Sequence, residues 1–273
     1  MTDLLENLLA DLAAEGDLLR TAVADLDEDG WRTPTAATGW DVSTQIGHLA
    51  WTDEVATVAA TDKAAWDAIV LQALEDPNGY VDTAALEVGR LGSDALLTRW
   101  GGARTALVDA LRAFPAGQRM PWFGPPMSPA SMATARFMET WAHALDVYEA
   151  IGVQPEVTDR IRHVAHLGVR TRDFAFSVHG LEAPAEEFRI ELAAPSGEAW
   201  TWGPEAAAQT VVGSAYDFCV LVTQRRHRAD TDLVATGADA GRWLDIAQAF
   251  AGPPGAGRAP ASVVEPVEMT GHE

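Results

Sequence analysis

The sequence predicts a mainly α-helical protein, in which a four-helix bundle is followed by a small α+β domain. Apolar residues recur at three- and four-residue steps through most of the first 150 residues, the spacing of amphipathic helices, and no strand pattern interrupts them. After "EAIGVQPEVTD" the pattern changes, and two runs rich in β-forming residues flank the Pro-Ser-Gly turn at 195–197. We therefore expect a bundle over residues 1–152, an α+β domain over 153–258 and a flexible tail over 259–273.

The bundle is predicted from four principal helices. The first covers residues 4–26, and the Gly- and Pro-containing loop "DEDGWRTPTAATGW" follows it. Thr38 or Asp41 can cap the second helix, which runs from about Val42 into the Ala-rich segment near Lys63. Further helical patterns cover about 64–74, 81–114 and 131–151, and the loop "FPAGQRMPWFGPPMSP" separates the last two.

The second domain is predicted to alternate between helices and short strands. A helix over about 158–176 leads to the hairpin around residues 195–197. A helix over about 205–223, a short strand "DLVATG" and a helix over about 239–250 complete it, before a tail rich in Pro and Gly.

Composition excludes several classes of function. The net charge of −21 argues against a nucleic-acid partner, because phosphate binding needs clustered Lys and Arg. No apolar run is long enough to span a membrane, and the acidic N-terminus does not resemble a secretory signal, so we expect a cytoplasmic protein. The single cysteine, Cys219, lies in the apolar run "YDFCVLV" and is interpreted as a core residue rather than a nucleophile. No feature determines the oligomeric state.

The segment "RFMETWAHALDVYEA" places four polar residues on one helical stripe: Arg136, Glu139, His143 and Asp146. A solvated face with weak charge pairs is one interpretation. A metal site is the other, because a Glu and a His four residues apart can reach the same cation. Asp146 could orient a ligand imidazole or be a surface carboxylate. The spacing alone is weak, since it arises by chance about once in every two chains of this composition.

A third residue strengthens the interpretation as a metal site. In "GWDVSTQIGHLAW", His48 has apolar neighbours on a predicted helix and therefore borders the core. An isolated histidine there would most often be a hydrogen-bonded core residue. Facing helices of a bundle, however, commonly build metal sites from inward carboxylates and imidazoles. Together, His48, Glu139 and His143 form a three-ligand set that leaves one zinc position open, which is typical of catalytic sites.

These motifs resemble a known family. "GW" at 39–40, "HL" at 48–49 and "ARFMETWAHALDVYEAIG" are similar to the DinB-like metal-binding superfamily, and most similar to the mycothiol-dependent maleylpyruvate isomerase family. The resemblance covers nearly the whole chain and implies a DinB-like four-helix bundle with a sterol-carrier-like α+β domain. It implies that His48, Glu139 and His143 are the metal ligands. It also implies mycothiol as a cosubstrate with a small electrophilic substrate.

The resemblance extends to the second domain. "AAQTVVGSAYDFCVLVTQRR" is similar to the family's C-terminal pattern, in which an arginine after a helix serves the active site. Arg225 matches that position best and is the implied catalytic residue. Gln224 stands where a glycine is usual, and Arg226 and Arg228 lie close by, so the choice among the three arginines stays open, as does a surface cluster.

The ligand set favours a divalent metal, with Zn²⁺ first, although iron, manganese or nickel would also fit. The resemblance implies a metal- and thiol-dependent isomerase or transferase. Two other hypotheses stay open: a metal-dependent hydrolase of a small amide or ester, and a non-catalytic protein that binds a metal or a small molecule. Trp122 and Phe123, in the Pro-rich loop, could shape a substrate entrance. His163 and His166 could form a pair, but the histidines near the domain junction, His163, His166 and His179, are interpreted as surface or interface residues.

Overall fold

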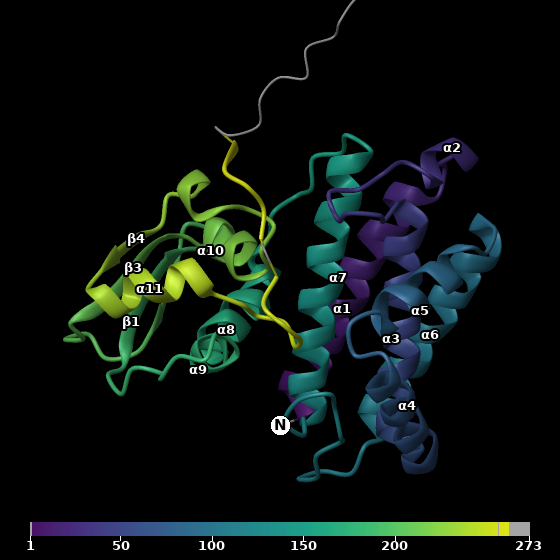
Figure 1. The fold of residues 1–273 in the computed structure, drawn as a ribbon, viewed down its shortest axis with the longest axis horizontal. Helices are drawn as coiled ribbons and strands as arrows, with labels where there is room; N and C mark the ends of the chain where they lie inside the picture. The colour runs from purple at the N-terminus through teal and green to yellow at the C-terminus, as the bar shows by residue number, and fades with distance from the viewer. Residues whose placement is uncertain (1, 256, 262–273) are drawn as a thin grey trace, which may run out of the picture. The chain divides into compact units, whose positions relative to one another are not determined.

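The computed structural model describes residues 2–255 and 257–261, and the chain forms two compact units (Figure 1). The first, here called the bundle unit, comprises Met1–Glu156 and Phe250–Gly252. The second, the sheet unit, comprises Val157–Ala249 and Pro253–Glu273. Most of the tail that we expected over 259–273 lies outside the described residues.

The bundle unit is helical, as predicted. Helix α3 packs against α5, α6 and α7, and α1 packs against α7 (Figure 1). Leucine, valine and tryptophan side chains from these helices fill the core. The four long helices are α1 (Thr2–Val23), α3 (Val42–Thr61), α6 (Ser93–Ala113) and α7 (Pro129–Ala150). The shorter ones are α2 (Glu28–Trp31), α4 (Lys63–Glu75) and α5 (Tyr80–Gly89).

Local signals fix the start of α3 and α7, the helices that carry His48, Glu139 and His143. Asp41 caps α3, since its Oδ1 accepts a hydrogen bond of 2.8 Å from the Thr44 backbone N–H. Ser128 caps α7 in the same way, with Pro129 at the first helical position. Gly47 allows α3 to approach α5 closely, because a Cβ atom there would lie 2.7 Å from the carbonyl oxygen of Ala85.

The helix predicted over 81–114 is wrong in its extent. Two helices, α5 and α6, occupy this range, and residues 90–92 separate them. Gly92 adopts an extended conformation (ψ 152°) and takes the N-cap position of α6. The hydrophobic pattern runs through the break, which explains why it predicted one helix.

The sheet unit contains a four-stranded sheet in the order β2-β1-β3-β4, with β1 and β3 parallel and the outer pairs antiparallel. Phe188 of β1 and Phe218 of α10 both pack against Trp243 of α11, so these helices cover one face of the sheet. The strands are β1 (Phe188–Ala193), β2 (Ala199–Trp202), β3 (Gln209–Ser214) and β4 (Val234–Thr236). The helices are α8 (Arg162–Arg170), α9 (Arg172–Val178), α10 (Ala215–Val222) and α11 (Ala238–Ile246), with short 3₁₀ turns at Asp159–Ile161 and Arg228–Asp230.

The hairpin predicted around residues 195–197 is confirmed, because β1 and β2 pair antiparallel on either side of it. The helix predicted over 205–223 is wrong in its first half, where residues 209–214 form β3 and α10 begins only at Ala215. Pairing with β1 on one side and β4 on the other overrides the local helical pattern. Cys219 is a buried core residue, as expected, and burial raises the pKa of its thiol well above the usual value.

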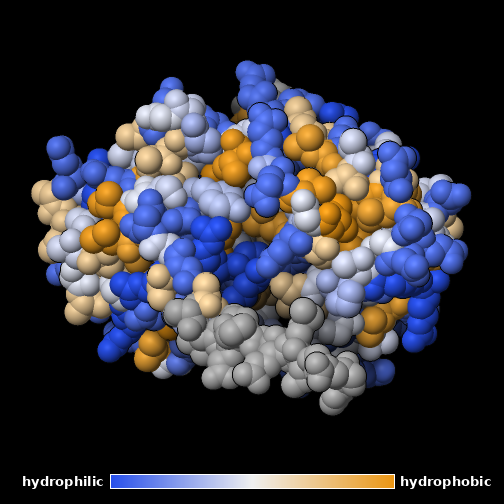
Figure 2. Space-filling view, turned by 90° about the horizontal axis from the view of Figure 1, so that it is seen from above, coloured by the Kyte–Doolittle hydropathy of each residue, from blue (hydrophilic) through white to orange (hydrophobic). Residues whose placement is uncertain are grey.

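Hydrophilic residues cover much of the face drawn in Figure 2, and hydrophobic residues form separate groups between them. None of the described helices has the length and apolar character that a membrane span requires.

Candidate metal centre

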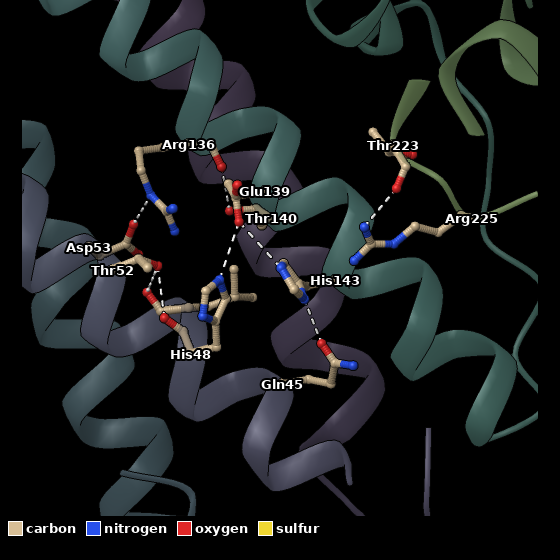
Figure 3. A network of polar contacts seen from close by, with 11 residues as sticks. Gln45, His48, Thr52, Asp53, Arg136, Glu139, Thr140, His143, Thr223 and Arg225 are labelled. Atoms are coloured by element: carbon tan, nitrogen blue, oxygen red, sulfur yellow. Dashed lines mark hydrogen bonds and ion pairs between the residues drawn. The ribbon is translucent and has the colours of Figure 1, made fainter. Parts of the chain in front are cut away.

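The structure brings His48, Glu139 and His143 together inside the bundle unit (Figure 3). Glu139 Oε2 lies 3.2 Å from His48 Nε2 and 3.3 Å from His143 Nε2. The ring centroids of the two histidines are 4.4 Å apart. One potential ligand atom from each residue lies within 4.8 Å of the other two.

Two helices supply all three side chains. His48 comes from the second turn of α3, whose start is fixed by the Asp41 cap, and the other two lie one turn apart on α7. Burial decreases in the order His48, His143, Glu139: their side chains are 8%, 13% and 23% exposed. The carboxylate is thus the most accessible member of a largely enclosed cluster.

The electrostatics favour a charged carboxylate. Burial raises the pKa of Glu139, but hydrogen bonds from His143 and His48 outweigh it and hold the pKa well below its usual range. The outer nitrogens of the two imidazoles differ. His143 Nδ1 lies 2.6 Å from the amide oxygen of Gln45, whereas His48 Nδ1 is buried and has no hydrogen-bond partner in the part of the chain that the structure describes.

Trp40 covers the two imidazoles. Its ring lies 5.9 Å from that of His143, nearly parallel at 18°, and 5.3 Å from that of His48. The indole Nε1 donates to Asp82 at 3.2 Å, which holds the ring in place. Gly39, in the left-handed region at φ 80°, directs the chain into this arrangement.

The interpretation of the polar stripe as a solvated face is wrong. Arg136 and Asp146 are only 2% and 3% exposed, and all four residues of the stripe are buried or partly buried. Arg136 does not depend on Glu139 for a partner, since its Nε donates to Asp53 Oδ1 at 2.8 Å (Figure 3). The interpretation of Asp146 as a surface carboxylate is therefore also wrong.

Gln45 is the residue that the sequence did not single out. It occupies the role of imidazole acceptor that we considered for Asp146. A signal was present in its position, since Gln45 precedes His48 by three residues and so shares its helix face. A glutamine three residues from a histidine is too common to be noticed without the fold.

Three further sequence hypotheses concern residues outside the cluster. Trp122 and Phe123 pack with Trp66, with ring centroids 5.0–5.7 Å apart, in a separate aromatic group of the bundle unit. His166 and His179 are exposed and His163 is partly buried. His166 accepts a hydrogen bond of 3.3 Å from the indole of Trp202.

Arg225 belongs to the sheet unit, where it follows α10. Its Nη1 donates to the backbone oxygen of Thr223 at 2.8 Å (Figure 3). The two neighbouring candidates contact carboxylates of the same unit: Arg226 pairs with Asp217 at 2.6 Å, and Arg228 pairs with Asp245 at 2.5 Å. Gln224, where the family pattern has glycine, adopts a positive φ of 59°.

Comparison with known proteins agrees with this architecture. The chain is similar over 85% of its length to crystal structures of a mycothiol-dependent maleylpyruvate isomerase (TM-score 0.56, 17% identity) and of a point mutant of it (TM-score 0.58, 16% identity), covering 92% of each. At this identity the likeness concerns the fold. Two uncharacterized proteins from Mycobacterium tuberculosis strains are 56% identical over 250 residues, covering 92% of this chain and 97% of theirs.

Two family models match. One, described as Wyosine base formation, covers residues 184–236, which include the four strands of the sheet. The other, described as the mycothiol maleylpyruvate isomerase N-terminal domain, covers residues 12–148, and thus half of the chain with all three residues of the cluster. On that match, the chain belongs to the mycothiol maleylpyruvate isomerase family.

Proposed function

We propose that the chain is a divalent-metal-dependent enzyme that uses the thiol of mycothiol. It would either isomerise a small electrophilic substrate or transfer the thiol to it. The observation that carries the proposal is the convergence of three ligand atoms, two imidazole nitrogens and a carboxylate oxygen, within the bundle unit. Family membership supports the use of a thiol.

The spacing of the donor atoms fits a metal ion. Metal–ligand bonds of about 2.0–2.1 Å at tetrahedral angles separate neighbouring ligand atoms by about 3.3 Å. The two nitrogen–oxygen separations in the cluster are 3.2 and 3.3 Å. Three protein ligands would leave one position for a guest, the arrangement of catalytic zinc sites. The set also suits other first-row ions, and Zn²⁺ is our first choice.

When bound, the metal would lower the pKa of a guest thiol and so favour the thiolate, which is the nucleophilic form. Residues of the bundle unit already provide a suitable environment for the metal. Glu139 offers a negative charge between two imidazoles, and Trp40 packs over both rings and limits their contact with water. Partial exposure of Glu139 leaves a route to the cluster.

The thiolate can then follow two courses. Addition to an activated cis double bond forms a carbon–sulfur bond and an enolate; rotation about the new single bond and elimination return the trans isomer and the thiolate. If a leaving group departs instead, the thiol stays on the product and is consumed. Both reactions begin with the same step. Because Cys219 is buried with a raised pKa, an external thiol is the better nucleophile.

We assign Arg225 the role of binding a substrate or thiol carboxylate, or of stabilising the enolate. The resemblance of the C-terminal segment to the family pattern supports this choice, since Arg225 best matches the position of the arginine that follows a helix there. The Arg225→Lys variant retains the charge but not the bidentate geometry, and we expect it to lower kcat/KM at least tenfold while metal content is unchanged.

The test has two parts, because metal binding and thiol dependence can fail separately. Metal per chain is measured in untagged wild type, His48→Ala and Glu139→Ala, with His166→Ala as a control from the sheet unit. Near-stoichiometric metal in wild type and control, lost in the two site variants, supports the site. Metal retained in both site variants, or absent from wild type, refutes it.

Turnover of maleylpyruvate is then followed with and without mycothiol. Activity that requires both the metal and the thiol supports the proposal. Thiol-independent turnover would refute the thiol mechanism while leaving the metal site intact, and thiol-independent cleavage of small amides or esters would favour a hydrolase. Consumption of thiol with the substrate distinguishes transfer from isomerisation.

A further inference from the structure

A series of three hydrogen bonds leads away from His143. His143 Nδ1 lies 2.6 Å from Gln45 Oε1, Gln45 Nε2 lies 2.9 Å from Thr35 Oγ1, and Thr35 Oγ1 lies 3.1 Å from the backbone oxygen of Trp40. The series links α7 to α3 and then to the loop before α3. Gln45 is fully buried at its centre.

In the structure, the series runs in one direction. A backbone carbonyl oxygen can only accept, so the single hydroxyl proton of Thr35 is donated to Trp40. The Thr35 oxygen must therefore accept from Gln45, which turns the amide nitrogen towards Thr35 and the amide oxygen towards His143. An amide oxygen also only accepts, so Gln45 favours the neutral His143 tautomer with the proton on Nδ1, whereas Glu139, which lies 3.3 Å from Nε2, favours the other one.

This direction favours Nε2 as the nitrogen of His143 that is available to a ligand. With the proton on Nδ1, the lone pair is on Nε2, the atom that lies 3.3 Å from Glu139 Oε2. The other tautomer would leave the buried amide oxygen of Gln45 without a donor, at a cost of about 1–3 kcal/mol. His48 differs, because its Nδ1 has no partner among the residues that the structure describes.

We infer that Gln45 is a positioning residue, which fixes the tautomer and ring orientation of His143 so that the Nε2 lone pair faces the ligand cluster. The hydrogen bond to Thr35 holds the Gln45 side-chain amide against a 180° rotation that would exchange its oxygen and nitrogen. The inference extends the proposed function and rests on it for the identity of the bound metal ion. The hydrogen-bond direction itself depends only on contacts within the bundle unit.

The loop that ends the series is held independently of the side chains. The backbone N–H of Thr35 donates to the Trp40 oxygen at 2.9 Å, so this carbonyl accepts from both the amide and the hydroxyl of Thr35. Trp40 also carries the indole that packs on His143. The same short loop therefore contacts the His143 ring in two ways. Trp40 packs on the face of the ring, and Thr35 orients Gln45, which contacts Nδ1 at its edge.

The first measurement is the tautomer of His143 in metal-free protein, by ¹⁵N NMR of labelled histidine at a pH where the ring is neutral. We expect a larger fraction of the Nδ1–H form in wild type and in Gln45→Glu, which keeps an acceptor, than in Gln45→Leu, where Glu139 draws the proton to Nε2. An unchanged tautomer in Gln45→Leu would overturn the inference. This readout needs no metal, so it stands even if the proposed metal site fails.

The second measurement is Zn²⁺ affinity by chelator competition, with the Co²⁺ absorption spectrum as a report on the ligand set. Loss of the acceptor in Gln45→Leu should weaken Zn²⁺ binding about 10–100-fold and change the Co²⁺ spectrum. Gln45→Glu should restore both to near wild type, and Thr35→Val should give a smaller loss. Affinities for Gln45→Leu within twofold of wild type, with an unaltered spectrum, would contradict the role of Gln45.

Should Gln45→Leu fail to fold, Thr35→Val carries the same test, because it removes the acceptor that orients the Gln45 amide and leaves the core volume nearly unchanged. Thr57→Val on α3 is the matched control: its hydroxyl donates to the Asp53 backbone oxygen at 2.9 Å and takes no part in the series. A shift of tautomer in Thr35→Val but not in Thr57→Val supports the inference, and equal behaviour of the two overturns it.

Discussion

Helices α3 and α7 enclose two buried polar clusters with opposite chemistry. One is the pair of Arg136 and Asp53, in which both side chains are at most 3% exposed and opposite charges meet at 2.8 Å. The other is the cluster of His48, Glu139 and His143, in which three electron-donating groups converge and the carboxylate is 23% exposed. In the first, here called the closed pair, the two charges compensate each other, although Arg136 Nη2 is buried without a hydrogen-bond partner among the described residues. The second, the open cluster, holds no cationic Lys or Arg side chain and is our proposed metal site.

The comparison shows how a charge-compensated pair differs from the proposed metal site on the same helices. Arg136 and Glu139 are three residues apart on α7, and a helical wheel would join them as an ion pair. Arg136 instead pairs across to α3, which leaves Glu139 to the imidazoles. The closed pair thus prevents an arginine from neutralising the carboxylate of the open cluster.

Breaking the closed pair should have the largest effect on stability. Asp53→Ala leaves the buried Arg136 guanidinium without its carboxylate, and we expect a loss of about 3–5 kcal/mol in the free energy of unfolding. Urea denaturation followed by circular dichroism measures it. The loss should be the same with and without Zn²⁺, because Asp53 is not a member of the ligand cluster.

A matched double variant controls for the removal of side-chain volume. In Asp53→Leu with Arg136→Met, no unpaired charge remains, so we expect the double variant to be more stable than either single one. Additive losses would show that the two side chains do not act as a pair, and would remove the contrast drawn between the two clusters.

Disabling the open cluster should have an intermediate effect that depends on the metal. A ligand present at 100 times its Kd stabilises the folded state by about 2.7 kcal/mol. Wild type should therefore gain about this much when Zn²⁺ replaces EDTA, and Glu139→Gln should gain almost nothing. Thermal unfolding of both proteins under the two conditions checks this, and an equal gain in the variant would locate Zn²⁺ elsewhere.

Much of this architecture could be predicted from the sequence, because it depends on local periodicity and caps. The Asp41 cap was one of two predicted candidates, and α1, α3 and α7 begin within two residues of their expected positions. The strand β3 could not be predicted, because it depends on pairing with β1, about twenty residues earlier. The break before α6 was hidden by a hydrophobic pattern that continues through it.

The same distinction between local and long-range contacts applies to the candidate site. Glu139 and His143 share one helix, so their proximity follows from spacing, and His48 was joined to them because it borders the core of the predicted bundle, with the family resemblance implying the same set. The partner of Arg136 lies 83 residues away and that of His143 lies 98 residues away. Neither contact leaves a periodic signal, so the sequence could not distinguish a buried ion pair from a solvated charge.

The smallest expected effect comes from the residue beside Asp53. Glu54 also lies on α3 and also pairs with an arginine, since Arg99 donates to both its oxygens at 2.8 Å. These side chains are 36% and 39% exposed, in contrast to the enclosed pair of Arg136 and Asp53. Water competes for both charges, so Glu54→Gln should cost only about 0.2–1 kcal/mol.

Urea denaturation at low and high salt separates the two pairs further. Salt screens exposed charges much more than buried ones, so the small loss in Glu54→Gln should shrink at about 1 M NaCl, where the screening length is about 3 Å. The loss in Asp53→Ala should persist there. If Glu54→Gln cost as much as Asp53→Ala, then pairing with arginine, rather than burial, would set the energy of these contacts. The distinction between a closed structural pair and a surface pair on α3 would then fail.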